Sequence, residues 1–157
     1  MNVVDLTPSP QTCRALAHAG FPQDTVFMWG HSTCLPSLPH VRPLDAVVEA
    51  DAVAAPVLSE VLARLPQRLD FAVPHPILGT VARAHALQIC YGDEVSVGYH
   101  LAGSHEVQCR TVAVGAVEAV ALLYLALHSA GLLPEVEHEG MNEDMRLGEQ
   151  QVLAKAA

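Results

Sequence analysis

The sequence has 157 residues, of which 51% are hydrophobic, 16% are charged and 4% are aromatic. A chain of this length and apolar content can bury the core of one domain without disulfides, which excludes a disordered body. Seventeen acids against eight Lys and Arg give a formal net charge of −9. This balance disfavours binding to nucleic acid or to an anionic membrane, because both require clustered Lys and Arg.

The cysteines and the N-terminus indicate a reducing compartment. The four cysteines, at positions 13, 34, 90 and 109, form no CxxC pair, and no basic-then-apolar signal sequence opens the chain. Two disulfides are arithmetically possible, but a disulfide framework is not expected, and we expect a cytoplasmic protein.

The elements predicted for the first part of the chain follow from proline, glycine and apolar spacing. Ser9-Pro10 is a typical helix start and Gly20 a typical stop. Three prolines within the stretch 31–45 exclude both a helix and a central strand there. The predicted elements are a helix over 10–19, a strand over 25–29, an irregular stretch over 31–45, an undecided stretch over 46–55 and a helix over 56–65.

The later part of the chain reads as strands followed by one long helix. Gly92-Asp93 is a hairpin signal, and the alternation of apolar residues after it predicts one buried strand face. The predicted elements are strands over 69–73, 87–91, 95–100 and 105–110, an undecided stretch over 77–85, and a helix over 114–130.

The long helix is apolar on all sides, so a membrane span has to be considered for residues 111–133. Glu118 lies within this run and would cost roughly 2.5–3.5 kcal/mol near the centre of a bilayer. We therefore expect a buried helix of a soluble protein. The order of elements predicts an α+β fold, with a small, mostly antiparallel sheet and about three helices packed on it. We expect a single domain over 1–133 and an acidic, mobile tail over 134–157.

The order of these motifs resembles a family of small uncharacterised proteins from phages and mobile elements of Bacteroidota. The segments that carry the resemblance are Leu16 to Gly20, Phe27-Met28-Trp29, Leu62 with Leu65-Pro66, Val95 to His100, Ala119, Leu122 to Leu125, Leu127-His128 and Gly131-Leu132. They cover about two-thirds of the chain, and the stretch 31–45 and the acidic tail depart from the pattern. The resemblance implies a setting, that of a soluble accessory protein of a mobile element, and no particular reaction.

Histidine and cysteine are the residues with the clearest chemical potential. His31 and Cys34 form an HxxC pair in a predicted loop, and His105 and Cys109 flank a predicted turn. Zinc binds Cys sulfur and His nitrogen tetrahedrally, with ligand pairs at such spacings from two loops. These four residues would form a zinc site if the loops meet, in a zinc-binding domain or a small metal-dependent enzyme. The alternative is that the thiols are buried and the histidines are exposed.

Other catalytic arrangements have less support. Cys34 with His31 or His40 could act as a nucleophile, but no orienting acid or oxyanion hole is evident. Asp93-Glu94 is better interpreted as a solvated turn. No GxGxxG, P-loop, HExxH or GxSxG pattern occurs.

The last 24 residues differ in composition from the rest, with six acids against Arg146 and Lys155. An acidic segment of this kind can bind a basic partner or act as a solubility tail. Its candidate partner-binding residues are Glu135, Glu137, Glu139, Glu143 and Asp144. The sequence therefore favours a non-enzymatic interaction protein that binds a protein partner, for example a host defence component. A homodimer is a further expectation, because an exposed sheet edge must be paired or protected.

Overall fold

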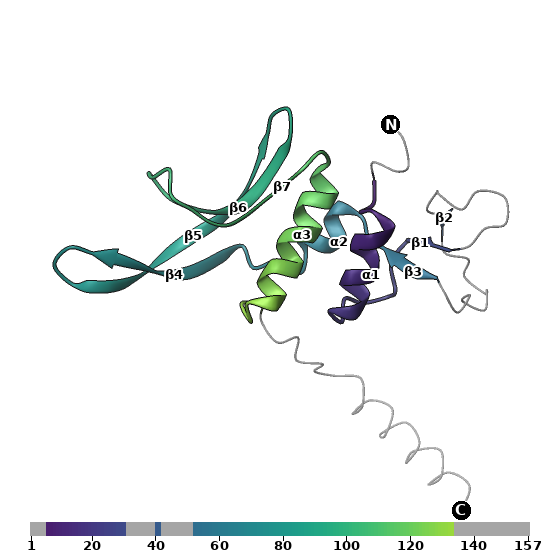
Figure 1. The fold of residues 1–157 in the computed structure, drawn as a ribbon, viewed down its shortest axis with the longest axis horizontal. Coiled ribbons are helices and arrows are strands. Elements are labelled where there is room, and N and C mark those ends of the chain that lie inside the picture. The colour runs from purple at the N-terminus through teal and green to yellow at the C-terminus, as the bar shows by residue number, and fades with distance from the viewer. Residues whose placement is uncertain (1–5, 31–39, 42–51, 134–157) are drawn as a thin grey trace, which may run out of the picture.

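A computed structural model describes residues 6–30, 40–41 and 52–133 (Figure 1). The elements are α1 (Pro10–His18), β1 (Phe27–Trp29), β2 (His40–Val41), β3 (Val53–Ala55), α2 (Leu58–Leu62), β4 (Arg68–His75), β5 (Gly79–Tyr91), β6 (Val95–Leu101), β7 (Val107–Ala113) and α3 (Ala116–Ser129). The strands form two antiparallel sheets, one of order β2-β1-β3 and one of order β4-β5-β6-β7. The predicted α+β class is confirmed, although the prediction did not separate two sheets.

Helix α1 begins and ends as its sequence predicts. The Ser9 hydroxyl accepts a hydrogen bond from the Thr12 backbone N–H at 3.2 Å, and Pro10 occupies the first turn. Gly20 has a φ of +78°, a conformation that glycine adopts without strain and that commonly ends a helix. Cys13 and Leu16 are fully or almost fully buried on the inner face of the helix.

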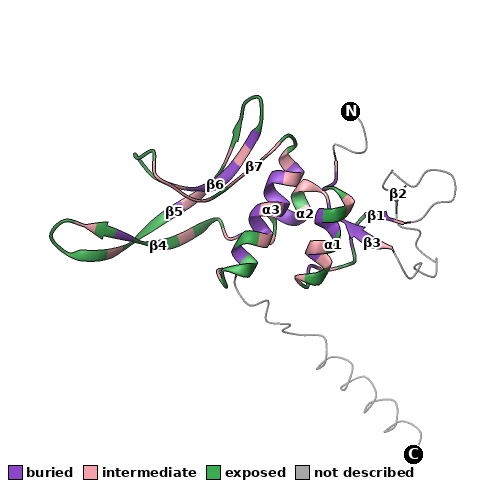
Figure 2. Cartoon of the chain, viewed as in Figure 1, coloured by how far each residue is buried: buried purple, intermediate pink, exposed green. Residues whose placement is uncertain are grey.

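Helix α3 is the centre of the core. Seven of its residues are buried, and the helix packs against β6, β7, α1 and α2. Figure 2 shows this concentration of buried residues along α3. The apolar residues on all sides of the helix are therefore explained by packing partners on several sides. Among the described residues, no helix is long and apolar enough to cross a membrane.

The one acid of α3, Glu118, caps the helix α1. Its carboxylate accepts hydrogen bonds from the Ser9 backbone N–H at 2.7 Å, from the Ser9 hydroxyl at 3.1 Å and from the Thr12 hydroxyl. A carboxylate at a helix N-terminus satisfies unpaired N–H groups and opposes the positive end of the helix dipole. Glu118 thus joins two helices that are distant in sequence.

The larger sheet is built on the long strand β5. Its second half pairs with β6 from Tyr91↔Val95 to His85↔Leu101, which confirms the predicted hairpin around Gly92-Asp93. Strand β7 pairs with β6 on the other side, with an irregular register between Val97 and Tyr99. At this irregularity Gly98 has no room for a side chain, since a Cβ would lie 2.9 Å from the Val107 side chain and 3.2 Å from Arg110 Cα. A larger residue at this position would therefore push β6 and β7 apart.

The stretch 77–85, undecided from sequence, forms the hairpin turn and the first part of β5. Gly79 to Ala84 pair with residues of β4 and, within the described chain, have no pairing with β6. Residues 70–84 therefore form a two-stranded hairpin, which we call the arm. Figure 1 shows that the arm projects away from the helices.

Candidate functional site

The predicted zinc ligands are only partly within the described residues. His31 and Cys34 lie outside them. His105 is exposed in the turn between β6 and β7, and Cys109 is half-buried in β7, where it packs against the core. Burial raises the pKa of the Cys109 thiol, which disfavours the thiolate that a metal would need. Among the described residues, no group of three or more His, Cys, Asp or Glu could hold a metal ion.

Of three further candidates from the sequence, two lie outside the described residues and one lies within them. The acidic candidates Glu135, Glu137, Glu139, Glu143 and Asp144 lie outside the described residues, as does the proposed nucleophile Cys34. Asp93 and Glu94 are both exposed in the turn between β5 and β6, in agreement with their interpretation as a solvated turn.

The arm carries two highly exposed large aliphatic side chains that are adjacent in the sequence. At its tip, the Ile77 side chain is 86% exposed and the Leu78 side chain 68% exposed. Figure 2 shows that most of the arm is exposed, in contrast to α3. From Phe71 to Ala82 the chain has no Asp, Glu, Lys or Arg. The tip is therefore an apolar, uncharged surface at the end of a projection.

The turn at the tip is held in one conformation by hydrogen bonds. The His75 ring nitrogen Nδ1 accepts hydrogen bonds from the backbone N–H groups of Ile77 at 3.3 Å and of Leu78 at 3.1 Å. Gly79 closes the turn with a φ of +77°, a backbone conformation that glycine adopts more readily than other residues. The two aliphatic side chains are thus presented on a fixed backbone.

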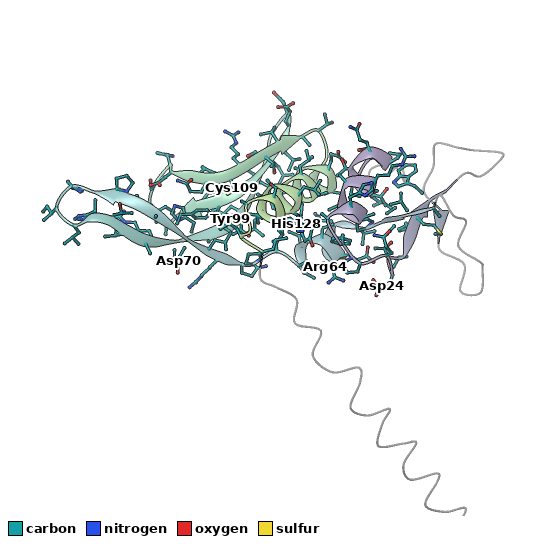
Figure 3. All side chains as sticks on the ribbon, turned by 60° about the horizontal axis from the view of Figure 1, so that its bottom comes forward. Asp24, Arg64, Asp70, Tyr99, Cys109 and His128 are labelled. Carbon is teal, nitrogen blue, oxygen red and sulfur yellow. The ribbon has the colours of Figure 1, made fainter. Side chains whose placement is uncertain are left out.

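The face of the arm that carries Phe71, Val73 and Val81 is less exposed than its opposite face. Val73 and Val81 are directly opposite each other, and Val73 is only 8% exposed. Closer to the body, Phe71 contacts the His85 ring edge-to-face, with 5.1 Å between ring centroids. Cross-strand pairs of β-branched and aromatic residues stabilise a hairpin. The arm is therefore ordered, although the rest of the sheet does not cover it. Figure 3 shows its side chains, with Asp70 labelled where the arm begins.

The base of the arm contains the one histidine described as fully buried. His85 has 0% of its surface exposed and pairs with Leu69 of β4 and Leu101 of β6. Its Nδ1 lies 2.8 Å from the Arg83 carbonyl oxygen, and its Nε2 lies 3.8 Å from Glu106 Oε1. His85 therefore connects the arm, the body of the sheet and the turn before β7.

A second group of exposed apolar residues lies at the other end of the sheet. Tyr91 is 71% exposed at the end of β5, and Val114 is 85% exposed after β7. Val95 lies between these two strand ends, because it pairs with Tyr91 on one side and Ala113 on the other. This group supplies a matched control for experiments on the arm.

Comparison with protein-family models, with curated proteins and with solved structures found no match for this chain.

The predicted strand over 69–73 is confirmed as part of β4, but the sequence reasoning missed the second strand of the arm, its tip and His85. The available signal for the tip was Ile77-Leu78, an aliphatic pair directly before a glycine and directly after Pro74-His75-Pro76. A turn signal that contains two large aliphatic residues is unusual, because turns favour Gly, Pro, Asn, Asp and Ser. For His85 no local signal existed, because its neighbour Glu106 is brought close by strand pairing.

Proposed function

We propose that this chain is a non-enzymatic interaction protein, which binds a protein partner by placing the tip of the arm in an apolar groove of that partner. The observation that supports this proposal most strongly is that Ile77 and Leu78 are exposed on a turn held by hydrogen bonds. Burying one aliphatic side chain of this size contributes about 1.5–3 kcal/mol. A turn that is already ordered loses little conformational entropy on binding.

The composition of the arm supports binding more than catalysis. Its tip offers aliphatic side chains, and the Nδ1 of its one imidazole already accepts two backbone hydrogen bonds. The first charges on either side are Asp70 and Arg83, which have opposite signs and lie at the base. A neutral apolar groove on the partner therefore matches the tip, and polar groups at the rim of the groove would face the base.

The resemblance to mobile-element proteins suggests where the partner is found. An accessory protein of a phage or mobile element encounters host proteins in the cytoplasm, so a host defence component is the first partner to test. The acidic segment 134–157 is proposed as a second contact, for a basic surface of the same partner.

The double variant Ile77→Ser/Leu78→Ser should reduce the amount of captured partner at least tenfold when the full chain is the bait in lysate. Loss of two apolar contacts at the centre of an interface exceeds the 1.4 kcal/mol that corresponds to tenfold. The matched control, Tyr91→Ser/Val114→Ser, removes similarly exposed apolar residues at the other end of the sheet and should leave capture unchanged. Thermal unfolding of all baits checks that the fold is retained.

Two outcomes would contradict the proposal. Undiminished capture by the tip variant would show that the arm is not the contact, and loss of capture only in the control variant would place the contact beside Tyr91. A differently tagged second copy of the chain in the bait sample tests whether the captured species is the protein itself. In that case the partner would be a second copy of the chain, and the two copies would form a homodimer through the edge of β4 or through the tip.

A further inference from the structure

Within the described chain, the larger sheet has three free edges. Strands β4 and β7 form its two ends, and the outer half of β5 (79–84) has no neighbour on the side where β6 pairs with the rest of that strand. A free edge presents backbone N–H and C=O groups that can pair with another extended segment, and proteins commonly obstruct such an edge with proline, charge or a bulge. The three edges of this sheet differ in whether they are obstructed.

The alternation of hydrogen bonds shows which residues of the arm face its edges. The Leu87 backbone N–H donates to the Gln67 carbonyl at 3.0 Å, and hydrogen-bonded pairs alternate with non-hydrogen-bonded pairs along an antiparallel ladder. In this alternation Ala72 and Ala82, which lie directly opposite each other, are a non-hydrogen-bonded pair, so their backbone groups point away from the ladder. The residues that face outwards in this way are Thr80, Ala82 and Ala84 on β5, and Arg68, Asp70, Ala72 and Pro74 on β4.

The edges of β4 and β7 are obstructed. On β4, Pro74 faces outwards and has no N–H to donate, and Arg68 and Asp70 place charges on the same edge. On β7, Cys109 has a φ of +50° and the register with β6 is irregular, which is a bulge that interrupts the row of outward groups. Neither edge therefore offers a continuous row of donors and acceptors.

The outer edge of β5 carries none of these obstructions. Residues 79–84 contain no proline, and the outward-facing Thr80, Ala82 and Ala84 are exposed and have small side chains. The one charged residue in this segment is Arg83, whose backbone groups point towards β4. An extended segment added here would lie in line with β6 and would continue the sheet along the arm.

We propose that this edge binds the same edge of a second copy of the chain, so that the two arms form one four-stranded antiparallel sheet around a two-fold axis at Val81. Thr80 of each copy then pairs with Ala82 of the other, in two hydrogen-bonded pairs of two bonds each. Val81 is opposite Val73 within the chain, so the valines of the two copies form one row across all four strands. Such β-branched cross-strand pairs stabilise a sheet.

Space and charge favour this register over the one with Ala82 on the axis. The shifted register would place Gly79 opposite His85 of the second copy, where Leu101 of that copy already lies. It would also place the two Arg83 residues at diagonal positions, about 7–8 Å apart. With Val81 on the axis, Arg83 is opposite Gly79 of the second copy. The two guanidinium-bearing residues are then about 14 Å apart along the strands, which exceeds the screening length of about 8 Å at physiological ionic strength.

Sedimentation of the purified full chain, over concentrations from micromolar to millimolar, tests the proposal. The wild type should change from monomer to dimer as its concentration rises. Ala82→Pro removes one N–H from each copy at this edge and should raise the dissociation constant by about tenfold or more. Ala72→Pro is the matched control, because it removes the N–H that faces the opposite edge of the arm, and it should keep the wild-type dissociation constant. Thermal unfolding checks that both variants retain the fold.

A disulfide across the axis provides a second readout, which needs no proline. Two residues of a non-hydrogen-bonded antiparallel pair have Cα atoms about 4.5 Å apart, within the range of about 4.4–6.8 Å that a disulfide spans. In a chain with Cys34→Ser and Cys90→Ser, the further change Val81→Cys should give a disulfide-linked dimer under mild oxidation. Ala72→Cys in the same background, at the other edge, should remain monomeric.

This inference goes beyond the proposed function, since it concerns the edge of the arm and requires no partner of another sequence. Both experiments use the purified chain alone, so their failure is distinguishable from failure of partner capture through the tip. A wild type that stays monomeric at all concentrations would overturn the proposal, as would a Val81→Cys chain that forms no linked dimer. Dimerisation that is lost in Ala72→Pro and kept in Ala82→Pro would place the contact on β4 and would equally overturn it.

Discussion

Replacing Leu123 by alanine should lower the free energy of unfolding by about 2–5 kcal/mol. Leu123 lies in α3 and has none of its surface exposed. The helix is held between β6 and β7 on one side and α1 and α2 on the others. The surrounding residues cannot collapse into the space, so the loss of apolar burial adds to the cost of a cavity. Urea unfolding followed by circular dichroism measures the change.

The arm supplies a control with the same chemistry. Leu78→Ala removes the same atoms at a position that is 68% exposed, and it should change the free energy of unfolding by no more than about 0.5 kcal/mol. If Leu78→Ala destabilised the chain as much as Leu123→Ala, the tip would belong to the core, and its availability for a partner would be refuted.

Stability should fall steeply as the pH rises from about 9 to about 12. Burial raises the pKa of Cys13 from 9.0 to about 12, against a smaller lowering by a hydrogen bond with Trp29, and the charge of Glu118 adds the smallest contribution, which also raises it. Burial likewise raises the pKa of Tyr99 from 10.0 to about 12. The unfolded chain therefore loses these protons at a lower pH than the folded chain, which favours unfolding. Each such group contributes a slope of about 1.4 kcal/mol per pH unit between its two pKa values.

The variant Cys13→Ala isolates the contribution of one group. It removes the thiol proton, so its stability should decline less steeply than that of the wild type between pH 9 and pH 10, before Tyr99 contributes. Cys90→Ala, which removes an exposed thiol from β5, should keep the slope of the wild type. Denaturant titrations at half-unit intervals of pH provide the slopes. A slope that Cys13→Ala leaves unchanged would mean that Cys13 ionises equally in both states.

The elements with a buried face were predictable from the sequence. In β6, Val95, Val97 and Tyr99 are buried toward α3, and the alternation of these residues with Ser96 and Gly98 predicted a strand with one buried face. Helix α3 was equally clear, because its apolar residues extend well beyond the length of a strand. In both cases burial creates a periodic pattern, and the pattern remains readable in the sequence.

The second strand of the arm was not predictable, because burial does not determine its residues. Ala82 and Ala84 are exposed in β5, and the sequence left the stretch 77–85 undecided. This segment is a strand because its backbone pairs with β4, a property that has no side-chain period. The contact between His85 and Glu106 was not predictable for a related reason. Glu106 is 21 positions later in the sequence and becomes a neighbour of His85 only through the register of β5, β6 and the following turn.

The acids of the chain acquire distinct roles in the structure. Glu118 caps α1, and Glu60 accepts hydrogen bonds from the backbone N–H groups of Val57 and Val26, which attaches α2 to the segment before β1. Glu106 faces His85 at the base of the arm. The excess of acids thus includes groups with fixed structural partners, whereas residues 71–82 of the arm carry no Asp, Glu, Lys or Arg.

Site-specific photo-crosslinking tests the central claim, contact through the tip of the arm, most directly. A photo-reactive phenylalanine derivative is placed at position 77 of the full chain, or at position 94 in the exposed turn between β5 and β6, and each form is irradiated in lysate. We expect one discrete protein to be covalently attached at position 77 and not at position 94. Attachment of the same protein at position 94 without attachment at position 77 would contradict the claim.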